Sequence, residues 1–114
     1  MFYDQNTQSQ STLKSVSRAS EEQAKVDDET SEMALYHYDS CFFCARVRKV
    51  IELLQLKIEF RNIMEHQSHA LDLLGKGGSG TVPCLHQENP GPGIEQWMYE
   101  SADIISYLRQ RFER

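Results

Sequence analysis

The sequence predicts a small α/β domain whose elements follow the order βαβ, α, ββ, α, with a four-stranded mixed sheet flanked by helices. Three observations lead to this prediction. Strand-like and helix-like apolar patterns alternate from residue 33 onward, a Pro-Gly-Pro-Gly run separates the last two strand patterns, and an amphipathic helix pattern ends the chain. At 114 residues, the chain has the length of one domain with a modest core.

The first 31 residues differ in composition from the rest. They are rich in Ser, Thr, Gln and acidic residues, and their scattered apolar residues follow no sustained period. We therefore expect a mobile extension over residues 1–31, of which residues 1–19 are dispensable. Ser20 followed by Gln23 fits a capping box, which favours one short helix over residues 20–30.

The domain itself is expected over residues 32–114 and begins with a βαβ unit over residues 33–63. The apolar and aromatic segment at 33–38 reads as a strand, and residues 57–63 alternate in the manner of a strand with one wetter face. The helix between them has apolar residues at helical spacing: Val47, Val50, Ile51 and Leu54. Two such strands should be parallel and joined by a right-handed crossover.

The second half supplies a helix, a hairpin and a final helix. Residues 66–74 form a short helix pattern that a glycine-rich run ends, and residues 81–87 and 95–101 form strands on either side of a turn signal. We expect an antiparallel hairpin with a long loop. Ser101 then caps a helix with an apolar face made of Ile104, Ile105, Leu108 and Phe112.

Charge and hydropathy exclude two classes of partner. A net charge of −5 and a pI near 5.3 argue against nucleic acid, because phosphate neutralisation needs clustered Lys and Arg. The basic cluster of Arg46, Arg48 and Lys49 reads as a solvated helix face. No apolar run is long enough for a membrane span, and the N-terminus has no apolar core of a secretory signal. We expect no membrane partner and a cytoplasmic location.

Cys41 and Cys44 form a CxxC motif where the first strand passes into its helix. A thiolate at Cys41 would face unpaired N–H groups and the positive end of the helix dipole, and Cys44 lies one turn further on the same face. One sulfur can attack a disulfide and the other can resolve it. Arg46 and Arg48 would assist the thiolate only slightly, since they lie beyond the first turn.

Two other readings of the cysteines stay open. The pair could be two small buried apolar residues, although a helix start is an exposed place for Cys41. It could also be half of a zinc site completed by Cys84 and His86, but that second pair has an unusual ligand spacing and no second CxxC exists. We expect a redox pair and no metal.

Three stretches carry a family resemblance: "LYHYDSCFFCARVRKV", "TVPCL" and "WMYESADIISYL". On these stretches, residues 33–114 resemble a glutaredoxin, and in parts the N-terminal domain of glutathione S-transferases. The resemblance implies a thioredoxin-like fold. A full transferase is not expected, because its second, all-helical domain would have to follow Arg114.

The resemblance assigns Cys41 as the nucleophile and Cys44 as the resolving thiol. The residues that it assigns to glutathione binding are Cys41, Thr81, Val82, Pro83, Glu100 and Ser101. A cis Val82–Pro83 bond would leave the Val82 backbone to pair with the tripeptide. At the γ-glutamyl end, Ser101 and nearby N–H groups would bind the carboxylate, and Glu100 the ammonium group.

The function expected on this resemblance is an enzyme, a glutathione-dependent thiol–disulfide oxidoreductase with a redox-active disulfide that takes part in electron transport. Its partners would be glutathione, as co-substrate, and proteins that carry disulfides or bound glutathione; it would be a monomer. Phe42 and Tyr38 depart from the Pro and Lys that glutaredoxins commonly have at these positions. The alternatives are a carrier, in which two subunits share a [2Fe–2S] cluster through Cys41 and two glutathiones, and a non-catalytic glutathione-binding module.

Four further side chains are expected to be structural. Cys84 reads as a buried strand residue, and His37 as a core histidine with its hydrogen bonds satisfied. Trp97 and Tyr99 belong to the hairpin and should pack against the domain.

Overall fold

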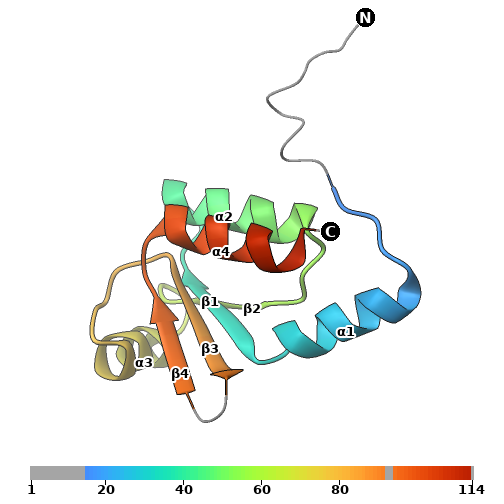
Figure 1. Cartoon of the computed structure of the whole chain (residues 1–114). Coiled ribbons are helices and arrows are strands. Elements are labelled where there is room, and N and C mark those ends of the chain that lie inside the picture. The colour runs from blue at the N-terminus through green and yellow to red at the C-terminus, as the bar shows by residue number, and fades with distance from the viewer. Residues whose placement is uncertain (1–14, 92–93, 114) are drawn as a thin grey trace, which may run out of the picture.

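A computed structural model describes residues 15–91 and 94–113. Over these residues the chain forms four helices and four strands (Figure 1). They are, in order, α1 (Ser20–Thr30), β1 (Met33–His37), α2 (Phe42–Leu53), β2 (Glu59–Asn62), α3 (Gln67–Gly77), β3 (Cys84–Gly91), β4 (Ile94–Met98) and α4 (Ser101–Phe112). Within this part of the chain, no helix is both long and apolar enough to cross a bilayer.

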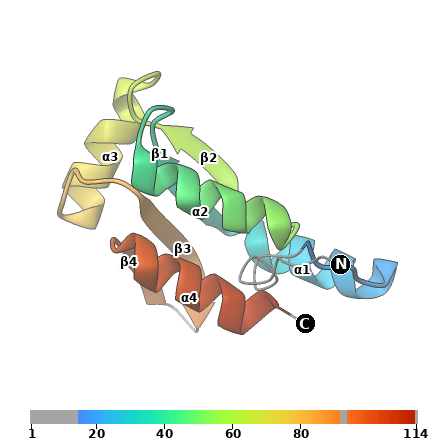
Figure 2. The same ribbon diagram turned by 90° about the horizontal axis from the view of Figure 1, so that it is seen from above.

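The four strands form one mixed sheet in the order β2-β1-β3-β4. Strands β1 and β2 are parallel, with Leu35 opposite Phe60, whereas β3 pairs antiparallel with both β1 and β4. Helices α2 and α4 pack side by side on one face of the sheet, and α3 lies on the other (Figures 1 and 2). The predicted α/β fold and its mixed four-stranded sheet are confirmed.

The core divides along β1, because successive side chains of a strand point to opposite faces. Leu35 faces the α2–α4 layer, where it belongs to the larger apolar cluster. That cluster consists of Met33, Leu35, Val47, Val50, Ile51, Leu54, Leu56, Ile58, Leu85, Ile104, Leu108 and Phe112. Tyr36 belongs to a smaller cluster with Leu73 of α3 and Cys84 of β3. The strand is buried along its whole length for this reason.

Glycine is required at the end of α3. Gly78 follows the helix with φ of 93° and its N–H donates to the carbonyl of Leu74, a left-handed helix end that suits glycine. At Gly77, an added Cβ atom would clash with the Tyr99 hydroxyl. The predicted glycine stop is confirmed, although α3 runs three residues beyond the predicted boundary of 74.

Two predicted helix caps are wrong. Helix α1 has Ala19 at its N-cap, without a side-chain capping bond, and Gln23 instead donates to Asp27 Oδ1 and the Gln55 carbonyl. Helix α4 has Glu100 at its N-cap, also without a side-chain capping bond, so Ser101 is its first residue. In both places a serine stands one position inside the helix, where it does not cap.

The hairpin differs from the prediction of a long loop. Strand β3 continues to Gly91, which pairs with Ile94, and the register shifts between Gln87 and Gly91. A shift of this kind lets one strand accommodate extra residues without ending the ladder. The predicted loop is therefore largely strand, and residues 92–93 lie outside the described residues.

The N-terminal segment is attached to the domain from Val16 onward. The Val16 N–H donates to the Leu53 carbonyl at 2.9 Å, and the Val16 and Val26 side chains pack against the larger cluster. Val16 and α1 thus contact the domain, which differs from the expected mobile extension, whereas the dispensability of residues 1–19 stays a prediction. The rest of the predicted extension, residues 1–14, lies outside the described residues.

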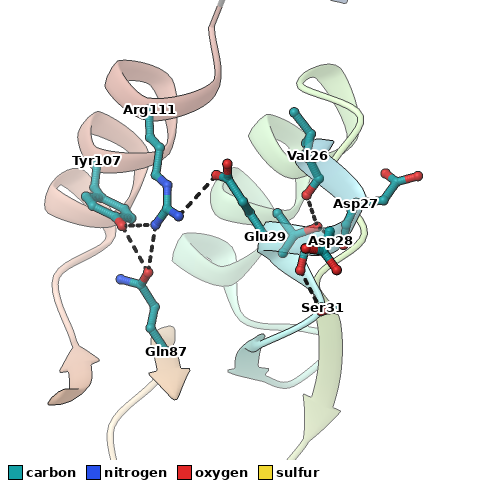
Figure 3. Close-up of polar contacts among 9 residues, drawn as sticks. Val26, Asp27, Asp28, Glu29, Ser31, Gln87, Tyr107 and Arg111 are labelled. Carbon is teal, nitrogen blue, oxygen red and sulfur yellow. Dashed lines mark hydrogen bonds and ion pairs between the residues drawn. The ribbon is translucent and has the colours of Figure 1, made fainter. Parts of the chain in front are cut away.

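A polar network joins α1 to α4 and β3. Arg111 donates to Glu29 Oε1 at 3.1 Å and to Gln87 Oε1 at 3.2 Å, and the Tyr107 hydroxyl donates to the same Gln87 oxygen at 2.9 Å (Figure 3). Gln87 is almost fully buried, so these bonds satisfy a polar group that would otherwise be costly to bury. The network keeps α1 at one end of the helical layer.

Candidate active site

One edge of the sheet collects the three segments to which the sequence assigned functional residues. Because β3 is antiparallel to both of its neighbours, β3 begins at the edge where β1 and β4 end. The N-terminal ends of α2 and α4 lie on the same side of the molecule (Figures 1 and 2). The structure thus brings Cys41, the segment 81–83 and the pair Glu100 and Ser101 to one edge.

Cys41 is the N-cap residue of α2. Its backbone is extended, with φ −74° and ψ 117°, and its Sγ accepts a hydrogen bond from the Cys44 N–H at 3.2 Å. Its own N–H donates to the Tyr38 carbonyl at 3.2 Å. The sulfur therefore takes the place of a capping oxygen, where N–H groups and the helix dipole favour an anion. Cys41 is only 9% exposed, so little of this residue is accessible to solvent.

Cys44 lies one turn further along α2 and is fully buried. Burial raises the pKa of the Cys44 thiol to about 12, and its hydrogen bond with Cys41 adds to the rise. Both cysteines are free thiols. The two sulfurs thus have different environments, one capping a helix and one held neutral in the interior.

Two exposed phenylalanines follow Cys41 at the start of α2. Phe42 is 69% exposed and Phe43 is 53% exposed, and their rings meet edge to face with centroids 5.3 Å apart. These side chains give the surface next to Cys41 an apolar character.

The segment before β3 is tied to the segment before α4. Val82 and Pro83 are joined by a cis peptide bond, as the resemblance implied. Tyr99, which precedes Glu100, donates from its hydroxyl to the Ser79 carbonyl at 2.9 Å and accepts from the Ser79 N–H at 3.2 Å. The Ser79 hydroxyl in turn bonds the Thr81 hydroxyl at 3.1 Å. These bonds hold two of the predicted glutathione-binding segments together.

The pair at the start of α4 is accessible. Glu100 is exposed and Ser101 is half-buried. The first N–H groups of a helix have no partner within it, so this end can accept an anion.

Cys84 is a buried residue of β3, as the sequence predicted. It is fully buried beside Tyr36 and Leu73, and burial raises the pKa of its thiol to about 12. His86, two residues on, stacks on Trp97 and bonds Glu95 at 2.7 Å. Among the described residues, no group of three His, Cys, Asp or Glu side chains is arranged to hold a metal ion.

Sequence reasoning gave Arg48 only a slight role, but the structure places it at the centre of the β1–α2 connection. Its guanidinium bonds His37 Nδ1 at 2.9 Å and donates to the carbonyls of Tyr38 at 3.3 Å and Asp39 at 3.1 Å. The one available signal was spacing: Arg48 follows Cys41 by seven residues, which places both on the same side of a helix.

Comparison with known proteins identifies the family of the chain. A sequence model of the family described as glutathione S-transferase, N-terminal domain, matches residues 35–114. No curated protein sequence matches the chain.

Solved structures show the same fold. Maleylacetoacetate isomerase from Anaeromyxobacter dehalogenans 2CP-1 aligns with a TM-score of 0.54 and 23% identity over 72% of this chain and 36% of its own. The chain therefore spans about a third of that isomerase. A wheat glutaredoxin aligns with a TM-score of 0.53 and 16% identity over 77% of this chain and 81% of its own. The thioredoxin-like fold expected from the sequence is confirmed.

Proposed function

Because the chain belongs to the glutathione S-transferase N-terminal domain family, we propose that it is a glutathione-dependent thiol–disulfide oxidoreductase of the glutaredoxin type. The observation that carries the proposal is the environment of Cys41, whose sulfur caps α2 and accepts the Cys44 N–H. Cys44, one turn away, supplies the second thiol that an internal Cys41–Cys44 disulfide requires.

The proposed reaction on a protein–glutathione mixed disulfide has two exchanges. The Cys41 thiolate attacks the glutathione sulfur, the protein sulfur leaves as a thiolate and takes up a proton, and Cys41 is left joined to glutathione. The thiolate of a second glutathione then attacks the glutathione sulfur of that adduct, which releases glutathione disulfide and restores the Cys41 thiolate. The net reaction consumes one glutathione thiol, and the other half of the glutathione disulfide comes from the substrate.

On a protein disulfide, Cys44 takes part. Cys41 attacks one sulfur, and Cys44 then attacks the Cys41 sulfur, so the substrate leaves with two thiols and a Cys41–Cys44 disulfide remains for glutathione to reduce. The raised pKa of Cys44 keeps this thiol neutral until it is needed. Release by glutathione should therefore be the faster route on mixed disulfides.

Glutathione is proposed to lie along the edge of the sheet between the starts of α2 and α4. Its cysteine would reach Cys41, the Val82 backbone would pair with its peptide groups, and Thr81 and Pro83 would line the same segment. Ser101 and the free N–H groups of α4 would bind the γ-glutamyl carboxylate, and Glu100 the ammonium group. The exposure of Glu100 and the absence of a side-chain cap on α4 support this placement.

Turnover of a small glutathione mixed disulfide, coupled to glutathione reductase, tests the proposal. Cys41→Ser should lower kcat/KM by about a hundredfold or more, because the nucleophile is lost. Cys44→Ser should keep most of the activity, since glutathione can release the adduct. Cys84→Ser, which replaces a buried thiol packed with Tyr36 and Leu73 and assigned no role in the reaction, is the matched control and should turn over at the wild-type rate. A folded wild-type protein without turnover, or an active Cys41→Ser variant, would refute the proposal.

A further inference from the structure

Arg48, in the middle of α2, contacts the segment between β1 and α2 that directly precedes Cys41. The side chain extends from the second turn of α2 toward the end of β1, where it meets His37, Tyr38 and Asp39 in succession. These are backbone carbonyls and one imidazole nitrogen, so all three partners accept hydrogen bonds from the guanidinium.

The Tyr38 carbonyl is shared between Arg48 and Cys41. It accepts the Cys41 N–H at 3.2 Å and Arg48 Nη1 at 3.3 Å. The turn before Cys41, residues 38–40, is also held from β2, because Asn62 Nδ2 donates to Asp39 Oδ1 at 3.2 Å. Asn62 is itself fixed by the N–H groups of Met64 and Glu65. The turn before Cys41 is therefore fixed from both neighbouring elements.

We propose that Arg48 is a positioning residue for the Cys41 thiol: by holding the Tyr38 and Asp39 carbonyls it keeps Cys41 at the N-cap of α2. The expected effect of Arg48 on turnover rests on the proposed oxidoreductase function. Its effect on the position of Cys41 can be measured without turnover.

The contacts require a guanidinium group. Nη1 reaches His37 and Tyr38 while Nη2 reaches Asp39, a spread of acceptors that suits a planar fork and not the single ammonium of lysine. His37 accepts from Arg48 through Nδ1 only when that nitrogen carries no proton. Burial, and then the Arg48 charge, lower the pKa of His37, which is consistent with a neutral imidazole in this contact.

The experiment compares Arg48→Met and Arg48→Lys with Lys49→Met. Lys49 is the neighbouring cation on α2; its side chain is 61% exposed and pairs with Glu52. Lys49→Met therefore changes the net charge by the same amount as Arg48→Met without altering the turn before Cys41. Hydrogen exchange of the Cys41 and Cys44 amides, followed by NMR, reports the turn and the cap directly. In both Arg48 variants these amides should exchange about tenfold faster, since their hydrogen bonds are loosened.

Turnover supplies the second readout. In both Arg48 variants kcat should fall by about tenfold, more in Arg48→Met than in Arg48→Lys, because a reacting group is misplaced. The KM for glutathione should stay unchanged, since Arg48 is not among the residues assigned to glutathione. Lys49→Met should match the wild type in exchange and in kcat.

The outcomes separate this inference from the proposed function. A folded Arg48→Met protein with wild-type exchange at Cys41, or with faster exchange and unchanged kcat, overturns the positioning role. If Arg48→Met does not fold, Arg48→Lys is judged by the same two criteria. If the wild type itself shows no turnover, the oxidoreductase proposal fails, and exchange at the Cys41 amide alone decides whether Arg48 positions the thiol.

Discussion

At the scale of single residues, the Tyr38 carbonyl joins the candidate nucleophile to a cation on α2, because it accepts from both the Cys41 N–H and Arg48. Cys41 was predictable as a helix-start thiol because strand and helix patterns meet there, and the structure places it at that junction. The partners of Arg48 were not predictable, because two of them are backbone carbonyls, which no side-chain pattern encodes. His37 was expected to be a satisfied core histidine, and the structure supplies its partner.

The buried His37 should make stability depend on pH. Its pKa is lowered from 6.5 by burial first and by Arg48 second, against the opposing carboxylates of Asp39 and Glu65. Below about pH 6.5 the unfolded chain therefore binds a proton at this histidine that the folded chain does not, so stability falls as pH decreases through this window.

His37→Asn tests this dependence, because an amide oxygen can accept from Arg48 without titrating. Urea unfolding between about pH 7.5 and about pH 5 should show a smaller loss of stability for the variant than for the wild type. The other histidines are common to both proteins and cancel in the comparison. Equal losses in the two proteins would show that His37 is not held neutral.

At the scale of elements, the types of helix and strand were predictable and their ends were not. Apolar and aromatic runs, the alternation at 57–63 and a turn signal predicted the four strands of the described residues, and helical spacing of apolar residues predicted α2 and α4. The end of β3 depends on pairing with β4 through a register shift, and that pairing is a long-range property. The docking of residues 15–19 was missed because their contacts go to the ends of distant helices.

Arg18 is the clearest case of such docking. It donates to the Leu54 carbonyl at 2.8 Å and to the Phe112 carbonyl at 2.6 Å, at the C-terminal ends of α2 and α4. Helix C-termini carry unpaired carbonyls and a partial negative charge. A cationic donor there can therefore hydrogen-bond the carbonyls and interact favourably with the helix dipole. The segment before α1 thus fastens the two helices that carry the candidate site.

Arg18→Met should lower the free energy of unfolding by about 2 kcal/mol, because two carbonyls lose a charged donor. Arg18→Lys should lose less, as it keeps the charge. The exposed Lys25 on α1 provides the control, and Lys25→Met should remain within about 0.5 kcal/mol of the wild type. Denaturant titration measures the free energy of unfolding of all three variants. An Arg18→Met protein as stable as the control would mean that the Arg18 hydrogen bonds contribute nothing to stability.

At the scale of the whole molecule, the topology of the sheet is what assembles the candidate site. Cys41, Val82 and Glu100 are far apart in sequence, yet the strands that precede or follow them all meet the same edge. The order of elements was enough to predict the sheet, and the family resemblance was needed to assign the glutathione-binding residues. The exposed phenylalanines beside the thiol and the Arg48 contacts became visible only in three dimensions.

The most direct test of the central claim is to trap the first covalent intermediate. The Cys44→Ser protein is mixed with glutathione disulfide, so that the Cys41 thiolate can displace one glutathione and remain joined to the other, with no neighbouring thiol to release it. Peptide mass mapping should then find one glutathione on Cys41 and none on the buried Cys84. An unmodified Cys41, or an adduct confined to Cys84, would contradict the assignment of Cys41 as the nucleophile.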